Sequence, residues 1–413
     1  MQLAVQKPRL EVADIFRAHG DAFLEGNITT TEQRKALRQI TDCRTAALGG
    51  HLDVCDSCGH TRISYNSCRD RHCPKCQNLK KAEWLAQRKE RLLPIHYFHV
   101  VFTLPHLLNA LILRNRSRLF NLLFKVAAET LNTIARDPRY LGAKIGFTAI
   151  LHTWGQNLHF HPHLHCVVTG GGIALDGSRW IPTRENYLFP VKVLGRLFRG
   201  KFLAELRTLY VAGHLDLDGA CKHLENPDAW KDLLDRLYDV DWVVYSKPPF
   251  GGPEQVFQYL GRYTHRVAIS NHRLIEMTDD EVAFRYRDYR DDGRNKVLRL
   301  KLHEFIRRFL LHILPKGFVK IRHYGILAGR NVDTLLKRSR EFLAKDQPSP
   351  TEAGLSVPEA PPLGSLPWPE RFLALTGVDI LACPACGTGR LVPRGEIPRA
   401  RIAALRVPIL NSS

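Results

Sequence analysis

The sequence lacks any apolar run that approaches the roughly 18 residues of a membrane-spanning helix. Its first residues, MQLAVQKPRLEVADIF, form a mixed amphipathic segment without the basic region and apolar core of a secretory signal. These absences argue against a membrane or secreted protein, and we expect the chain to be soluble and cytoplasmic. The phosphate-binding pattern G-x-x-x-x-G-K followed by Ser or Thr is also absent, which removes the usual sign of an ATP-driven enzyme.

Acidic residues are scarce relative to basic ones. The 413 residues include 60 Lys and Arg against 41 Asp and Glu, which gives a formal net charge of +19. Such an excess indicates a polyanionic partner, and nucleic acid is the simplest candidate. The length is sufficient for a substantial core and two or three domains.

Cysteine is concentrated in one segment. Ten cysteines are present, and six of them fall between Cys43 and Cys76. Because no export signal exists, reduced thiolates on zinc explain this segment better than disulfides. Cys55-x-x-Cys58 and Cys73-x-x-Cys76 flank the strand-like stretch TRISY, and each pair can present two thiolates to one tetrahedral ion. We therefore predict a zinc ribbon with these four cysteines as ligands, and buried free thiols as the alternative.

The same segment contains enough further ligands for a second zinc site. We assign to it Cys43, His51, Cys68 and His72, with His60 as the alternative to His51. A module this short cannot bury much core, so zinc would supply folding energy. Nearby basic side chains would face phosphate groups: Arg44, Arg62, Arg69, Arg71, Lys75, Lys80 and Lys81.

Another cysteine pair lies near the end of the sequence, in Cys383-Pro-Ala-Cys386-Gly. The pair looks like half of another zinc ribbon, but two ligands cannot close a tetrahedral site. Either cysteines or histidines from elsewhere complete it, or the pair is vestigial, and the sequence favours neither. Residues 346–369, which precede the pair, are rich in proline and poor in periodicity, which is typical of a linker.

The stretch QNLHFHPHLHCVVTGGG contains histidines in a strand-like pattern. Alternate residues of a strand share a face, so His163 and His165 should stand side by side, roughly 6.5 Å apart, as a two-imidazole clamp for a metal. The triple glycine Gly170–Gly172 should end this strand. Polar residues on a solvated strand are the alternative, and four histidines within seven residues argue against it.

A second stretch of interest, FGGPEQVFQYLGRYTHRVAIS, follows about ninety residues later and is typical of a helix. At about 100° per residue, Arg262 and Arg266 lie on a polar stripe, and Tyr259 and Tyr263 lie at its border with an apolar stripe. Both hydroxyls should therefore emerge beside cations. Tyrosines at this spacing are also common as core and rim aromatics, and that alternative stays open.

The predicted elements indicate an α+β fold. Strands are expected at residues 95–104, around the histidines and at residues 241–246, with helices between them, which favours a sheet that carries the histidines and a helix that carries the tyrosines across its face. Further strands are expected between residues 273 and 302. Basic and aromatic residues alternate there and could track a single nucleic-acid strand, with a solvated basic face as the alternative.

Together, His163-Leu164-His165 and Tyr259-x-x-x-Tyr263 resemble the two-tyrosine HUH endonucleases. Within that group, the cysteine segment and the run YLGRYTHRVAISNHR resemble the rolling-circle insertion-sequence transposases, and FHVVFTLP resembles the first-strand motif of rolling-circle initiators. The resemblance covers residues 40–345. It implies an HUH-type nuclease domain, an antiparallel sheet with helices, preceded by a small helical and zinc-ribbon domain.

This resemblance implies a catalytic metal. His163 and His165, with Gln156 or His161 as the third ligand, would hold Mg²⁺ or Mn²⁺ against the scissile phosphate of single-stranded DNA. Imidazole is a softer ligand than Mg²⁺ prefers, so Mn²⁺ should be the better activator in vitro. Zn²⁺ in the cysteine segment would be structural, and that module would help to recognise the ends of the mobile element.

It also implies a covalent intermediate. Tyr259 or Tyr263 would attack the phosphate, which gives a 5′-phosphotyrosine and a free 3′-hydroxyl, and the other tyrosine would serve a second cleavage or strand transfer. Arg262 and Arg266 would lower the tyrosine pKa or bind flanking phosphates. The expected function is rolling-circle transposition of an insertion sequence. Which tyrosine acts first and the oligomeric state do not follow from the sequence.

Other functions stay open at this point. A replication initiator or relaxase of a plasmid or phage would share the chemistry. A zinc-dependent DNA-binding protein would bind DNA without catalysing a reaction. A zinc hydrolase is less favoured because no H-E-x-x-H pattern is present. The expected parts are N-terminal helices (1–42), a zinc-binding domain with its following helix (43–93), the catalytic domain (94–270), its basic extension (271–345), a Pro-rich linker (346–369) and a tail with the cysteine pair (370–413).

Overall fold

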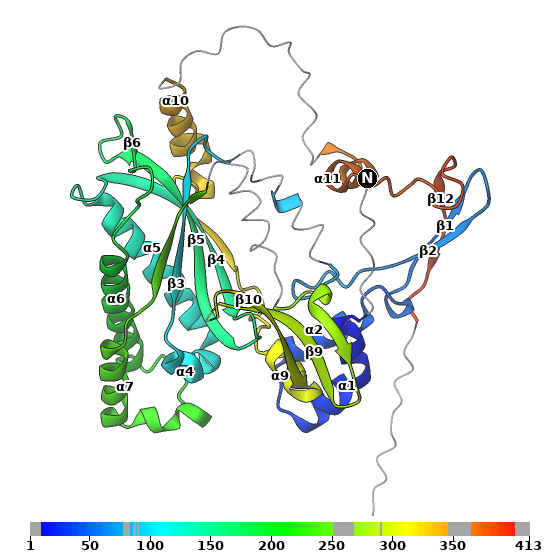
Figure 1. The fold of residues 1–413 in the computed structure, drawn as a ribbon, viewed down its shortest axis with the longest axis horizontal. Coiled ribbons are helices and arrows are strands. Elements are labelled where there is room, and N and C mark those ends of the chain that lie inside the picture. The colour runs from blue at the N-terminus through cyan, green and yellow to red at the C-terminus, as the bar shows by residue number, and fades with distance from the viewer. Residues whose placement is uncertain are drawn as a thin grey trace, which may run out of the picture.

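The structure is a computed structural model that describes residues 10–76, 83–85, 88, 91–250, 268–289, 291–345 and 365–400. These residues form a mixed α+β fold with antiparallel sheets, as the sequence predicted (Figure 1). The described part contains a six-stranded central sheet and two three-stranded sheets. None of the helices in that part combines the length and the apolar character needed to cross a membrane.

The central sheet has the strand order β11-β4-β5-β3-β7, and β6 pairs with β5. Its strands are β3 (Tyr97–Thr103), β4 (Ala143–Trp154), β5 (Phe160–Ala174), β6 (Trp180–Pro182), β7 (Val244–Phe250) and β11 (Ile321–Gly325). β4 and β5 form a long hairpin in which His152 lies opposite His163. β3 pairs with the other edge of β5, where Val101 lies opposite His165.

Helices pack on one face of this sheet. α5 (Arg116–Arg136) and α6 (Val191–Val211) lie against it, with α4 (Asn109–Arg114) and α7 (Pro227–Asp239) beside them. Phe102 of β3 and Leu164 of β5 are buried in the core that forms there. Successive side chains of a strand point to opposite faces, so burial of Leu164 directs His163 and His165 to the other face.

Strand β5 does not end at Gly170–Gly172, as the sequence had predicted, but continues to Ala174. β4 pairs with this part of β5 on one side and β6 on the other. A Cβ atom on Gly172 would collide with the backbone oxygen of Lys144 in β4. The glycine therefore permits a close approach of two strands.

The N-terminal helices share a core with a distant part of the chain. α1 (Val12–Gly26) and α2 (Thr31–Asp42) pack with α9 (Leu302–Leu310) and with the sheet of β8 (Leu274–Met277), β9 (Glu281–Asp288) and β10 (Arg294–Lys301). Phe16 and Phe309 meet edge to face with ring centroids 5.1 Å apart. The predicted capping box of α2 is present, since Thr30 accepts the N–H of Gln33 and Gln33 accepts the N–H of Thr30.

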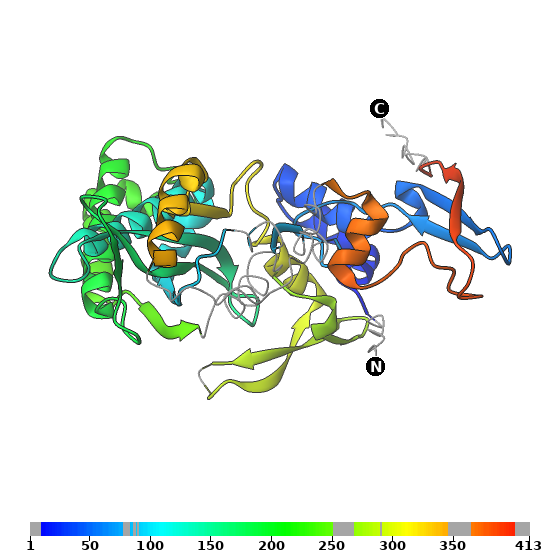
Figure 2. The same cartoon turned by 90° about the horizontal axis from the view of Figure 1, so that it is seen from above.

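The third sheet joins an early and a late segment of the described chain. Its strand order is β12-β1-β2, with β1 (Gly50–Cys55), β2 (Thr61–Tyr65) and β12 (Leu391–Ile397). Figure 2 shows the red C-terminal strand beside the blue N-terminal hairpin. Two further helices are α10 (Lys337–Lys345) and α11 (Trp368–Thr376). Short 3-10 or π-helical turns lie at Ala46–Leu48, His106–Leu108, Gly219–Glu225, Asn271–Arg273, Gly329–Asn331 and Val332–Leu336.

Candidate metal centres

Three imidazoles meet on the face of the central sheet opposite α5 and α6. His152 of β4 lies across from His163 of β5, and His165 follows on the same face. One ring nitrogen of each lies within 4.8 Å of the others, and the Nε2 atoms of His163 and His165 are 3.1 Å apart. The structure thus places His163 and His165 side by side and adds His152. Such spacing suits imidazoles that share one metal ion.

Hydrogen bonds orient these rings. Nδ1 of His163 donates to the backbone oxygen of His161 at 2.6 Å, which leaves Nε2 of His163 with its lone pair. Nδ1 of His165 lies 2.9 Å from Nε2 of His99 on β3. Burial lowers the pKa of His163 to about 4. The ring is therefore neutral at pH 7, which is the form that binds a metal.

A cavity of about 330 Å³ opens over the histidines. Its walls include Gln156 and His161, and three residues from other parts of the fold: Tyr245 of β7, Arg273 and Tyr289. The guanidinium group of Arg273 donates to the backbone oxygen of Gln156. A fixed cation at the wall of a histidine-lined cavity suits an anionic substrate such as a phosphodiester.

Both residues considered as a third ligand line the cavity, and Nδ1 of His161 also lies 3.0 Å from Nε2 of His106. The sequence did not single out His152. Counting back from the turn would not have found it, because the register shifts between Trp154, which lies opposite Phe160, and His152, which lies opposite His163.

The predicted nucleophiles and their basic neighbours cannot be located in the same way. Tyr259, Tyr263, Arg262 and Arg266 lie outside the described residues. The structure describes the chain up to Phe250, the last residue of β7, and again from residue 268.

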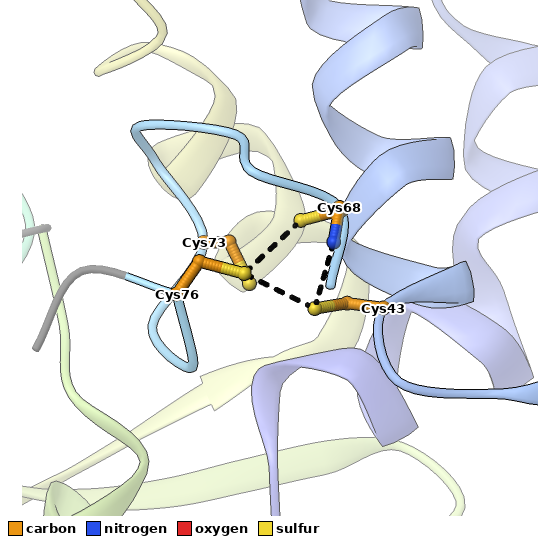
Figure 3. A group of neighbouring side chains, drawn as sticks. All are labelled: Cys43, Cys68, Cys73 and Cys76. Atoms are coloured by element: carbon orange, nitrogen blue, oxygen red, sulfur yellow. Dashed lines mark hydrogen bonds between the residues drawn. The ribbon is translucent and has the colours of Figure 1, made fainter. Parts of the chain in front are cut away.

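A first group of four cysteines lies between α2 and the loop after β2 (Figure 3). The Sγ atoms of Cys43 and Cys76 are 3.3 Å apart, those of Cys68 and Cys76 are 3.5 Å apart, and Cys73 completes the group within 4.8 Å. Tetrahedral Zn–S bonds of about 2.3 Å separate the sulfurs by about 3.8 Å, so the group fits one Zn²⁺. Hydrogen bonds among the four thiols lower the pKa of Cys43 and Cys76 and raise the pKa of Cys68 and Cys73.

A second group combines two cysteines of the N-terminal hairpin with the pair near the end of the sequence: Cys55, Cys58, Cys383 and Cys386. The prediction that Cys55 and Cys58 share an ion with Cys73 and Cys76 is therefore wrong. β1 and β2 pair as a hairpin, which carries the Cys55–Cys58 turn away from the loop that contains Cys73 and Cys76. The hairpin register, which the spacing of the cysteines does not reveal, decides the grouping.

The second predicted zinc site also needs correction. Cys43 and Cys68 do lie together, but with two further cysteines in place of His51 and His72. His51 is exposed on β1. Nε2 of His72 accepts the N–H of Leu314, in the segment after α9, at 3.1 Å. Its lone pair is therefore used in this hydrogen bond and not in binding a metal.

Comparison with known families assigns the chain to a class. A family model described as "Transposase zinc-binding domain" matches residues 15–104, which include the first cysteine group. A model described as "Putative transposase" matches residues 146–334, which include the three clustered histidines. The protein is therefore a zinc-binding transposase.

More narrowly, the chain belongs to the family of IS91-type transposases, and the resemblance seen in its motifs is confirmed. It is 50% identical over 383 residues to "Putative transposase y4qJ" of Sinorhizobium fredii, an alignment that covers 92% of this chain and 94% of that one. It is 29% identical over 390 residues to the transposase for insertion sequence element IS801 of Pseudomonas savastanoi pv. phaseolicola, with 93% and 88% covered. No solved structure matches the chain.

Proposed function

We propose that this transposase nicks and joins single-stranded DNA through a 5′-phosphotyrosine intermediate during rolling-circle transposition of an insertion sequence. Tyr259 or Tyr263 is the proposed nucleophile. The observation that carries the proposal is the cluster of His152, His163 and His165 in a cavity that Arg273 also lines.

The three imidazoles fit a divalent metal, because their ring nitrogens converge within 4.8 Å. Mn²⁺ or Mg²⁺ bound there would polarise the phosphate oxygens and offset the charge that grows in the transition state. Imidazole ligands favour Mn²⁺ over Mg²⁺. Gln156, in the wall of the same cavity, can add an oxygen ligand, as the sequence suggested.

The chain on either side of the tyrosine segment supports the proposed nucleophiles. Phe250 at the end of β7 lies opposite Tyr97, at the end of β3 that is far from the histidines. Arg273, shortly after the described chain resumes, lies in the wall of the histidine cavity. Residues 251–267 connect these two places. The segment that contains both tyrosines therefore continues, a few residues later, into a residue of the cavity wall.

Transesterification of this kind needs no outside energy source. The tyrosine oxygen would bond to phosphorus and lose its proton, while the bond from phosphorus to the 3′ oxygen breaks and that oxygen gains a proton. The phosphodiester energy stays in the phosphotyrosine until a 3′-hydroxyl attacks it. Arg273 would hold the phosphate in the cavity, and Arg262 and Arg266 would contact flanking phosphates.

The exposed side of the β8–β10 sheet supports a single strand as the substrate. Arg285, Arg287, Arg299 and Lys301 are exposed on β9 and β10. Tyr289 is 66% exposed and also lines the histidine cavity. Cations that track a backbone and an aromatic ring that stacks a base are the usual elements of single-strand binding.

Covalent adduct formation tests the proposal. Protein with Mn²⁺ and single strands from the ends of the element should give a gel-stable adduct, which should disappear in His163→Ala and in the double variant Tyr259→Phe/Tyr263→Phe. Tyr245→Phe is the matched control, because Tyr245 also lines the cavity and the adduct should persist without its hydroxyl. An adduct in the double variant, or its loss in Tyr245→Phe, would contradict the assignment.

The same assay separates the other functions. A plasmid or phage initiator, or a relaxase, would cut a replication or transfer origin in place of element ends. A zinc-dependent DNA-binding protein would bind the strands and form no adduct under any of these conditions.

A further inference from the structure

We propose that a second zinc ion joins the β1–β2 hairpin to the segment before β12. Its ligands would be Cys55 and Cys58 at the end of β1 and Cys383 and Cys386 before β12. The matched zinc-binding model ends at residue 104, so it assigns nothing to the second pair. The result is a zinc ribbon that is split between residues 50–65 and 381–397, and it does not depend on how the enzyme cuts DNA.

The four sulfur atoms have the spacing of a zinc–thiolate site. Sγ of Cys55 is 3.8 Å from Sγ of Cys386, and Sγ of Cys58 is 3.7 Å from Sγ of Cys383. A zinc ion with four bonds of about 2.3 Å separates its sulfurs by about 3.8 Å. The observed distances therefore match a tetrahedral thiolate site.

The two cysteine pairs form matching turns. Each has the sequence Cys-x-x-Cys-Gly, and the two glycines, Gly59 and Gly387, have left-handed φ angles of 72° and 70°. The N–H of Gly59 donates to the oxygen of Cys55 at 3.2 Å, and the N–H of Gly387 donates to the oxygen of Cys383 at 3.0 Å. The same two-thiolate turn therefore occurs twice in the chain, and the two turns face each other.

Backbone N–H groups point at the sulfurs. The N–H of Ser57 lies 3.4 Å from Sγ of Cys55, and the N–H of Gly389 lies 3.3 Å from Sγ of Cys386. Donors in these positions stabilise thiolates and orient them as ligands. Both halves of the site therefore carry the supporting hydrogen bonds of a metal centre.

Backbone pairing brings the halves together. β12 pairs antiparallel with β1, and the ladder ends with Leu391 opposite Cys55. Just beyond it, the N–H of Asp56 donates to the oxygen of Arg390 at 3.0 Å, and the N–H of Arg390 donates to Oδ1 of Asp56 at 2.7 Å. These bonds fix the register in which the two turns meet.

Very little apolar surface is buried at this sheet. Apart from cysteines, its hydrophobic cluster contains Leu391 alone, and residues 392–396 of β12 are exposed. A small sheet without a core is marginally stable in water. We therefore expect zinc, and not packing, to hold the C-terminal segment in place.

Zinc content is the first test. The double variant Cys383→Ser/Cys386→Ser should contain one zinc ion per chain fewer than the unaltered protein, measured by mass spectrometry of the metal. Cys221→Ser is the control, because Cys221 belongs to neither cysteine group and its loss should leave the content unchanged. An unchanged zinc content in the double variant would overturn the proposal.

Cleavage of the chain tests whether the second zinc ion holds the C-terminal segment to the β1–β2 hairpin. After cleavage at a protease site inserted within residues 346–364, the C-terminal fragment should stay with the rest of the protein on gel filtration. The fragment should separate in the Cys383→Ser/Cys386→Ser background, where the first zinc group is intact. Separation in the unaltered background, or retention in the double variant, would overturn the proposal. Retention that dithiothreitol abolishes and a chelator does not would indicate disulfides and overturn it as well.

Discussion

His152 is the residue that most directly tests the composition of the histidine site. His152→Ala removes one of three converging nitrogens, so the Mn²⁺-dependent adduct should form at least about 100-fold more slowly, since loss of groups that only support a ligand already costs about 10–100-fold. The measurement is the rate of adduct formation across a Mn²⁺ titration. Gln156→Ala serves as the matched change in the same cavity and should have a smaller effect. The opposite ranking would make Gln156 the third ligand.

Buried His312 should make the protein sensitive to mild acid. Its Nε2 donates to the oxygen of Leu158 at 3.1 Å, and burial lowers its pKa to about 3. Because the pKa in the unfolded chain is near 6.5, the unfolded state binds the proton first, so stability is full above pH 6.5 and falls as the pH drops toward 3. The loss at pH 5 should be roughly 2 kcal/mol from this group alone.

Thermal melting of the unaltered protein and His312→Gln between pH 7.5 and 5 measures this effect. Glutamine can still donate to Leu158 but does not titrate, so the variant should be less stable at pH 7.5 and less sensitive to acid. Release of zinc at low pH would lower both melting temperatures alike. Parallel pH profiles for the two proteins would show that His312 does not contribute.

At the residue scale, local sequence patterns predicted the structure correctly, whereas contacts between distant segments could not be predicted from the sequence. The period of a strand correctly placed His163 and His165 on one face. His152 required the register of the β4–β5 hairpin. The partner of Cys55 is 331 positions away, at Cys386, and no local pattern connects the two.

Among the elements, strand β5 depends on its glycines. Gly172→Ala should destabilise the protein by about 1–3 kcal/mol, because the added Cβ meets the backbone oxygen of Lys144, which cannot turn away as a side chain would. Gly200→Ala in α6 is the control, since a Cβ there meets nothing within 4 Å and should add up to about 1 kcal/mol of stability. Chemical denaturation gives both values, and equal effects would contradict this role of Gly172.

The same strand shows why elements were only partly predictable. Glycine is rare inside strands, so the sequence predicted an end where β5 continues. What keeps the strand intact is the close approach of β4, a tertiary constraint. The capping box of α2, by contrast, lies within four consecutive residues, and it formed as predicted.

For the whole molecule, the net charge of +19 should appear in the salt dependence of DNA binding. Arg285→Ala/Lys301→Ala, on the exposed side of the β8–β10 sheet, should lower the slope of log affinity against log salt by about 1.4 for a single strand. Lys231→Ala/Arg236→Ala, on α7 at the lower left of Figure 1 and apart from the β8–β10 sheet, should leave the slope unchanged. Fluorescence anisotropy at several salt concentrations measures both, and equal slopes would show that the β8–β10 sheet does not contact the strand.

The way the parts combine was the least predictable feature. The composition indicated the polyanionic partner, and motifs indicated the α+β fold. The sequence divides the chain into consecutive parts, yet α1 and α2 share a core with α9, and the β1–β2 hairpin shares a sheet with β12. Both contacts join segments more than 250 positions apart in the sequence, and they depend on surfaces that exist only after each segment has folded.

The sheet that pairs β12 with β1 also sets an order of events on the ribosome. Cys58 and Cys383 are 325 positions apart. At about 5–20 residues per second, roughly 16 to 65 s pass between the synthesis of one turn and of the other. The first cysteine group, by contrast, has all its ligands as soon as Cys76 emerges. The zinc ribbon would therefore form late. A polypeptide released before residue 383 would contain Cys55 and Cys58 without the two cysteines that complete their site.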